Sequence, residues 1–187
     1  YTKINKKDIS IINHNFNIEK ILSFHGIKKG IENTNYLLKS KNKKYILTIF
    51  EKRVKEEDIP FFIDLKLYLF KNNFKCPQPI KNKNGEIVNS LKSKKAILIT
   101  FIEGDKITMP TSDHCKEVGI MIGDLHNLTI NFNQKRHNSL DIKEWKYLFN
   151  KCENQNEIKF EKLILELKNE INFLEKFWPK RLPSGII

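Results

Sequence analysis

The chain has 187 residues, of which 40% are hydrophobic, so it can bury a core as one domain or as two small ones. Its 34 basic and 22 acidic residues give a formal net charge of +12, which permits a nucleic acid or an anionic membrane surface as a partner. Against that, the lysines are scattered in short clusters near expected turns, and no nucleic-acid-binding motif is present. A composition biased toward Lys, Asn and Ile explains the charge, and a basic site for a nucleotide phosphate is compatible with both interpretations.

No stretch of about 18 apolar residues exists, so no transmembrane helix is expected. A basic segment followed by an apolar one is missing at the start, so no secretory leader is expected either. The three cysteines, Cys76, Cys115 and Cys152, are odd in number and widely spaced. This favours reduced thiols in the cytoplasm over a disulfide framework or a zinc site. We therefore expect a cytoplasmic protein with no membrane and no nucleic-acid partner, and no pattern predicts its oligomeric state.

A helix is predicted over residues 8–21, where apolar residues recur near helical spacing. The period then changes to that of β-strands, and three strands are predicted, over 21–29, 35–40 and 43–52. A second helix is predicted over 56–73, with four apolar residues facing inward: Phe62, Leu65, Leu69 and Phe70. Asn84-Gly85 then indicates a hairpin turn between the segments 78–82 and 86–91. The nearly all-apolar segment 95–104 predicts a central strand.

Residues 104–111 are predicted to form a linker, and the chain after it is helical. Ser112 or Asp113 can cap a helix with an apolar stripe. A short helix around Trp145 and a longer one over 160–174 follow.

The predicted order is five strands with one helix inserted after the third, and then helices. This is not the alternating order of a doubly wound sheet. The sequence therefore predicts an α+β fold with a sheet lobe over 1–103, a linker over 104–111 and helices over 112–187.

Short segments along the whole chain carry a family resemblance: GIENTNYLL (30–38), YILTIFEKR (45–53), PFF (60–62), CPQPI (76–80), TFIEG (100–104), IGDLHNLT (122–129), NSL (138–140) and WPKRLPSGII (178–187). In this order they resemble the aminoglycoside phosphotransferase and choline kinase superfamily, and within it the homoserine kinases. The resemblance implies a protein-kinase-like two-lobed fold. Its first lobe would be an antiparallel sheet with one inserted helix, and residues 112–187 would be a truncated helical lobe.

The resemblance also implies an activity: ATP, with Mg²⁺, would phosphorylate the side-chain hydroxyl of L-homoserine, a step in threonine biosynthesis. Two alternatives stay open. One is a sibling kinase acting on choline, a sugar or an aminoglycoside. The other is a non-catalytic basic binding module, which predicts salt-sensitive binding to nucleic acid and no affinity for nucleotides.

In the family a His-x-Asp catalytic loop, a later Asn and a metal-binding Asp come after the segment that ends at Ile187. We therefore expect an N-terminal fragment with no catalytic or metal-binding residue of its own. We expect it to be inactive and poorly stable alone, because apolar faces of its helical lobe would be exposed.

For the nucleotide, the resemblance implies a phosphate-covering loop in which Gly30 permits close backbone approach and Asn33, Thr34 and Asn35 supply polar groups. The loop departs from the full glycine-rich pattern because it has one glycine. An Asn-rich turn is also typical of an ordinary hairpin.

Kinases of this fold usually carry a cation on the third strand, where this chain has Thr48. Lys52 or Arg53, at the end of that strand, is our candidate substitute, although lysines at strand ends are commonly only solvated. Glu57 and Asp64 are the candidate acidic partners on the following helix.

The resemblance further implies that the carbonyl of Thr100 and the amide of Ile102 read the edge of the adenine ring, in a hinge that would otherwise be an ordinary buried strand. His126 is expected to support the catalytic loop without touching substrate. Asn138 and Ser139 are the substrate-side candidates, and a helix cap with its loop is an equally simple explanation for them.

Overall fold

The structure is a computed structural model that describes residues 2–28, 32–52, 54–153, 160–181 and 185–186. The chain divides into two compact units, Tyr1–Gln134 with Ile186–Ile187 and Lys135–Gly185. We describe each unit by itself. The lobe boundary predicted at 104–111 stays a prediction.

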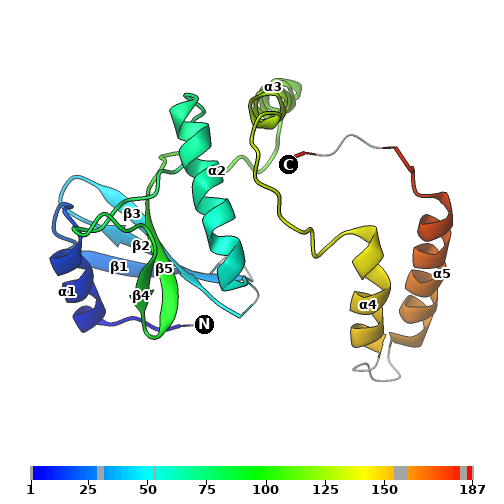
Figure 1. The fold of residues 1–187 in the computed structure, drawn as a ribbon, viewed down its shortest axis with the longest axis horizontal. Helices are drawn as coiled ribbons and strands as arrows, with labels where there is room; N and C mark the ends of the chain where they lie inside the picture. The colour runs from blue at the N-terminus through cyan, green and yellow to red at the C-terminus, as the bar shows by residue number, and fades with distance from the viewer. Residues whose placement is uncertain (1, 29–31, 53, 154–159, 182–184, 187) are drawn as a thin grey trace. The chain divides into compact units, whose positions relative to one another are not determined.

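The first unit is built on a five-stranded antiparallel sheet with the order β1-β2-β3-β5-β4 (Figure 1). Its strands are β1 Ser23–Ile27, β2 Asn33–Lys39, β3 Lys44–Phe50, β4 Asn89–Leu91 and β5 Lys94–Thr100. A helix, α2, is inserted between β3 and β4. The predicted α+β fold with one inserted helix is therefore confirmed, and β5 lies inside the sheet as its apolar sequence predicts.

Side chains alternate between the two faces of the sheet along every strand, so each face carries apolar side chains that need to be covered. A helix packs on each face. Helix α1 (Lys6–Asn15) lies against one face, where its buried Ile9 and Ile12 share a core with Leu38, Leu47 and Leu98. On the other face, α2 (Ile59–Lys71) buries two residues against part of β3 and β5. The two helices lie on opposite sides of the sheet in Figure 1.

The predicted first helix, 8–21, was too long. Asn5 starts α1 two residues earlier than predicted, through a capping box with Asp8. The helix ends at Asn15, and Phe16 is extended and forms an isolated β-bridge with Asn82. The helical spacing of Phe16 predicted that the helix continues through it. Phe16 is instead buried in the core under α1 from an extended backbone.

The predicted inward face of the second helix was partly wrong. Leu69 is buried, but Phe70 is 58% exposed. Ile59 and Ile63 provide the buried contacts with the sheet instead. The turn at Asn84-Gly85 is confirmed, with Gly85 at a φ of +84° that favours glycine.

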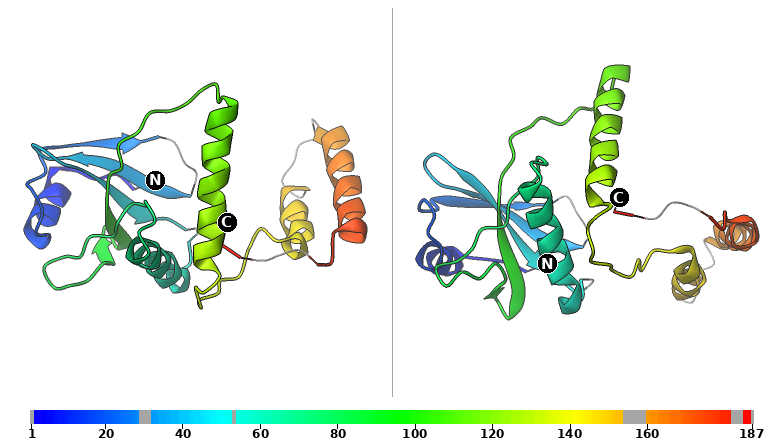
Figure 2. Two further views of the ribbon diagram at one scale, coloured as in Figure 1. Left: turned by 90° about the horizontal axis from the view of Figure 1, so that it is seen from above. Right: turned by 45° about the horizontal axis from the view of Figure 1, so that its top comes forward.

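Helix α3 (Ser112–Thr129) follows an extended connection from β5 (Figure 2). Its cap is Thr111, one or two residues before the predicted position, and Thr111 forms a reciprocal capping box with His114. Much of the predicted apolar stripe is exposed, including Val118 at 56% and Met121 at 54%.

The second unit contains α4 (Ile142–Glu153) and α5 (Glu161–Phe177). The Trp145 and Trp178 rings meet edge to face at 5.3 Å, and Lys146 pairs with Glu175. In the described part of α5 no residue is fully buried. Among all described helices, none combines the length and apolar character needed to cross a membrane.

Candidate nucleotide-binding site

An apolar strip crosses the sheet on the face that α1 does not cover. The register pairs Leu37 with Ile46 and Ile46 with Ile99. The residues next to these in each strand belong to the core under α1, so alternation directs the three side chains to the opposite face. Leu37 and Ile46 are only half-buried, because α2 packs over β5 and the end of β3. A strip of this kind suits one face of an aromatic base.

A polar row lies beside this strip, nearer to the connection between β1 and β2. There the register places Asn35 between Ile27 and Thr48. The Thr48 hydroxyl donates a hydrogen bond of 2.8 Å to the Asn35 side-chain oxygen. Ile27 is 38% exposed, and His25 on the same strand is exposed too. This end of the face is therefore open and polar, as a site for phosphate groups would need to be.

The predicted phosphate-loop residues divide between the two faces of the sheet. Asn33 and Asn35 alternate with Thr34 along β2, so Thr34 points toward the α1 face, where it is 7% exposed. Its hydroxyl donates to Glu51 at 2.6 Å. A phosphate oxygen would reach that hydroxyl only by displacing the carboxylate. Gly30 lies outside the described residues.

The predicted third-strand cation is missing from the middle of β3. Thr48 occupies that place, and its hydroxyl partner is the neutral Asn35. Lys52 follows the strand and is exposed, while Arg53 lies outside the described residues. The geometry is compatible with Lys52 as a source of charge at the strand end, and its role in phosphate binding stays a prediction.

The predicted acidic partners on the helical side hold other groups. Glu57 forms an exposed ion pair with Lys55 at 3.5 Å. The Asp64 carboxylate accepts a hydrogen bond of 2.6 Å from the Gln134 amide. Neither is bonded to Lys52.

Sequence reasoning missed Glu51, which is the acidic residue that does hold a lysine at the end of β3. Its carboxylate pairs with Lys94, the first residue of β5, and its side chain is 15% exposed. The hydrogen bond from Lys94, and then the one from Thr34, lower the pKa of Glu51 from 4.5 to about 2. The antiparallel register of β3 and β5 predicts this pairing, because Ile49 lies opposite Ala96. A single sequence without known strand partners does not reveal it.

The predicted hinge begins where β5 ends at Thr100. The backbone amide of Gln78 donates a hydrogen bond to the Thr100 hydroxyl at 2.8 Å. The backbone amide of Thr100 donates one to the backbone carbonyl of Gln78 at 2.9 Å. Within the part of the chain that the structure describes, the Ile102 amide has no hydrogen-bond acceptor, and Ile102 is 37% exposed. The amide is therefore available to an acceptor on a bound base.

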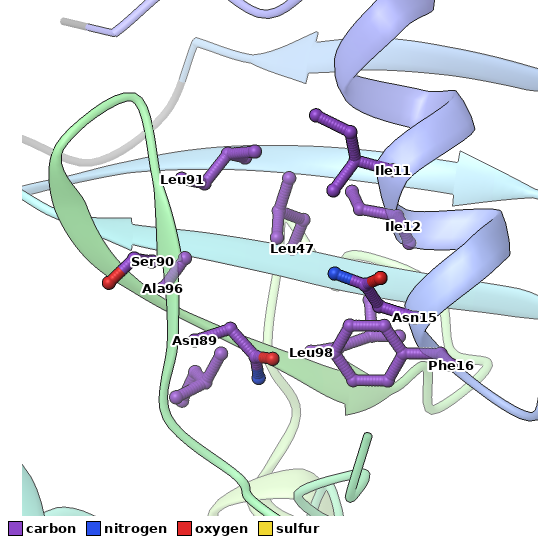
Figure 3. Close-up of a pocket in the computed structure, with 11 residues that line it drawn as sticks. Ile11, Ile12, Asn15, Phe16, Leu47, Asn89, Ser90, Leu91, Ala96 and Leu98 are labelled. Atoms are coloured by element: carbon purple, nitrogen blue, oxygen red, sulfur yellow. The ribbon is translucent and has the colours of Figure 1, made fainter. Parts of the chain in front are cut away.

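Two pockets lie away from this strip. One, of about 20 Å³, lies between α1 and the sheet, has mainly apolar walls and holds at most a water molecule (Figure 3). The other, an open depression of about 580 Å³, is lined by Tyr45, Thr100, Phe101 and neighbouring polar residues beside the hinge. Lys43 and Lys44 both line it, and the Lys44 ammonium pairs with Glu103 at 2.8 Å.

The remaining candidates lie in or after α3. His126 is exposed in the last turn of α3, where its carbonyl accepts from the Thr129 hydroxyl at 3.3 Å. In the second unit, the Asn138 side chain accepts from the Leu140 amide at 3.0 Å, an arrangement typical of a turn before a helix. Ser139 is exposed beside it. The support role of His126 and the substrate roles of Asn138 and Ser139 stay predictions.

Three comparisons place the chain among known proteins. The profile of the phosphotransferase enzyme family matches residues 23–187. The chain is 36% identical to a homoserine kinase of Bartonella tribocorum over 187 residues, and 36% identical to one of Brucella ovis over 190. It is covered completely in both alignments but spans only 59% and 57% of these relatives' lengths.

Solved structures support the same fold. A spectinomycin phosphotransferase bound to ADP and spectinomycin matches 98% of this chain and 60% of its own, with a TM-score of 0.73 and 16% identity. An amicoumacin kinase bound to AMP-PNP, Ca²⁺ and its antibiotic matches 83% of this chain and 55% of its own, with a TM-score of 0.56 and 14% identity. The chain thus has the kinase-like fold of these structures, and it belongs to the phosphotransferase enzyme family.

Proposed function

We propose that the full-length protein transfers the γ-phosphoryl group of ATP to the side-chain hydroxyl of L-homoserine. The observation that carries this proposal is the 36% identity to homoserine kinases across the whole of the chain. In the family this reaction is a step in threonine biosynthesis, and we place the protein in the cytoplasm accordingly.

The open half of the sheet provides the proposed nucleotide site. The adenine ring would lie on the apolar strip of Leu37, Ile46 and Ile99, and the hinge amide of Ile102 and carbonyl of Thr100 would bind its edge. The phosphates would extend toward Asn33 and Asn35, below the loop that contains Gly30, with charge supplied by Lys52 or Arg53. Phosphoryl transfer depends mainly on positioning and on compensation of phosphate charge, so a rigid sheet with a polar end is suited to it.

Magnesium would neutralise charge on the β- and γ-phosphates. Hard oxygen ligands, chiefly carboxylates, bind this ion. Among the described residues, no cluster of three His, Cys, Asp or Glu side chains could hold a metal. The family resemblance implies a metal-binding Asp after the segment that ends at Ile187, and our proposal assigns the Mg²⁺ ligands there. Asn138 and Ser139 remain our candidates for contact with the amino-acid substrate.

A panel of acceptors tests the proposal. The full-length protein with ATP and Mg²⁺ is supplied separately with L-homoserine, choline, a hexose and spectinomycin, and ADP release is measured. We expect release with homoserine at a kcat/KM at least about 100-fold above the other acceptors, since a site built to bond an acceptor's polar groups strongly rejects analogues without them. Preferred transfer to another acceptor would establish the sibling kinase instead. Salt-sensitive nucleic-acid binding without affinity for ATP would support the basic binding module.

A further inference from the structure

We propose that Glu51 is a positioning residue for the nucleotide, because it ties the segment Thr2–Asn5 and the start of β2 into one network. This inference rests on the nucleotide site proposed above. It adds a residue, and a role for the segment before α1, that the family resemblance does not supply.

The Glu51 carboxylate gathers groups from four parts of the chain. One carboxylate oxygen accepts from the Thr34 hydroxyl at 2.6 Å, from the Thr2 hydroxyl at 2.8 Å and from the Thr2 amide at 2.9 Å. The other oxygen pairs with the ammonium of Lys94, which also donates to the Thr2 hydroxyl at 2.7 Å. Residues from the N-terminal segment, β2, the end of β3 and β5 therefore share one charged centre.

Tyr36 fastens the same segment from β2. Its hydroxyl donates to the Thr2 carbonyl at 2.9 Å and accepts from the Ile4 amide at 3.3 Å. Ile4 is itself buried in the core under α1. The segment is thus held by hydrogen bonds to its backbone and by burial of the Ile4 side chain.

Alternation along β2 connects this network to the nucleotide face. Thr34 and Tyr36 point back to the segment, while Asn33 and Asn35 point to the opposite face. One backbone carries both sets of side chains, so a displacement of the β2 backbone moves the side chains on both faces. The network therefore holds the β2 backbone from which Asn33 and Asn35 project.

The chemistry of the network suits a rigid support. Glu51 and Thr34 are largely buried, with the Glu51 side chain 15% exposed and Thr34 7% exposed. Hydrogen bonds to an ionised carboxylate are shorter and stronger than neutral ones. Lys94 holds the pKa of Glu51 near 2, so the carboxylate stays ionised at physiological pH. The Glu51 carboxylate lies on the face away from the proposed nucleotide, whereas the Glu51 backbone amide donates a long hydrogen bond of 3.5 Å to the Asn33 side-chain oxygen.

The test compares Glu51→Gln with Glu56→Gln in the full-length protein. The control Glu56 is 74% exposed and pairs with Lys95 at 3.7 Å, outside the network. The measurements are the Kd for AMP-PNP by calorimetry, the KM for homoserine, and the melting temperature. For Glu51→Gln we expect the AMP-PNP Kd to rise about tenfold, equal to the loss of about one strong interaction. The KM for homoserine should stay within about twofold, and Glu51→Asp should restore part of the nucleotide affinity.

Two results would overturn the inference. One is an AMP-PNP Kd for Glu51→Gln equal to that of Glu56→Gln. The other is an equal loss of AMP-PNP and homoserine affinity together with a lower melting temperature, which indicates a purely structural residue. A wild-type protein that binds AMP-PNP but does not phosphorylate homoserine would refute the proposed function. The AMP-PNP Kd values of Glu51→Gln and Glu56→Gln would still decide whether Glu51 positions the nucleotide.

Discussion

The hydroxyl of Tyr68 in α2 donates a hydrogen bond of 2.9 Å to the carbonyl of Leu128 near the end of α3. The last carbonyls of a helix have no partner within it, so Tyr68 satisfies a group that would otherwise need water. Phe132 packs against the same place, with its ring centroid 5.3 Å from that of Tyr68 and 5.7 Å from that of Phe61. Helix α2 is thus joined to α3 by contacts between residues far apart in sequence, as well as by the chain itself.

Removing this hydroxyl should weaken the junction and leave its packing intact. We expect Tyr68→Phe to lower the free energy of unfolding of the full-length protein by about 1 kcal/mol, because the ring contacts remain and one hydrogen bond is lost. Urea unfolding followed by circular dichroism measures this. Tyr147→Phe, at a site that is 57% exposed, is the control and should change little. Equal stabilities of the two variants would show that the hydrogen bond contributes nothing.

The core under α1 should respond strongly to a cavity. Leu98 is 0% exposed at the centre of the sheet, whereas Leu67 on α2 is 36% exposed. We expect Leu98→Ala to cost about 2–5 kcal/mol of unfolding free energy, from lost burial and the remaining cavity. Leu67→Ala should cost well under half as much. If denaturant titrations gave a similar, small loss of unfolding free energy for Leu98→Ala and Leu67→Ala, Leu98 would not lie in a tightly packed core.

The pair of Thr48 and Asn35 should matter for nucleotide affinity. Thr48→Val keeps the shape of the side chain and removes the donor to Asn35, so the Asn35 amide is free to rotate away from the proposed phosphate position. We expect the KM for ATP to rise about fivefold, the equivalent of about 1 kcal/mol. Thr48→Ser retains the hydroxyl and should stay near the wild type. An unchanged KM for ATP in Thr48→Val would show that Asn35 does not bind the nucleotide.

Glu51 should also give stability a specific dependence on pH. Its pKa is depressed from 4.5 to about 2 in the folded protein, chiefly by Lys94. A depressed pKa stabilises the folded state above the unfolded-state value, and this contribution is lost as pH falls from about 4.5 toward 2. We expect the melting temperature of wild type to fall more steeply in this window than that of Glu51→Gln. Parallel curves measured by differential scanning fluorimetry would refute the assignment.

Local patterns predicted most of the elements, and tertiary contacts decided the details that they missed. The apolar content of β5 predicted its place inside the sheet, as found. The end of α1 was missed because Phe16 has helical spacing but is buried from an extended backbone. Phe70 was expected inside because it is large and apolar, although Ile59 and Ile63 are the residues of α2 that reach the sheet.

The candidate site shows the same division. The position of Thr48 in β3 and the end of β5 near Thr100 follow from the order of segments in the sequence. The orientation of Thr34 away from the nucleotide face depends on the exact residue at which β2 begins. The pairing of Glu51 with Lys94 depends on which strands are neighbours, and sequence spacing alone does not contain that information.

The location of the nucleotide is the central claim, and hydrogen–deuterium exchange on the full-length protein with and without AMP-PNP tests it most directly. We predict slower exchange on nucleotide addition in residues 33–37 and 100–104, with no change in α1, Lys6–Asn15, on the opposite face of the sheet. The Ile102 amide should show the largest effect, because it gains an acceptor that it otherwise lacks among the described residues. Protection confined to α1, or no protection in the hinge at saturating AMP-PNP, would contradict this site.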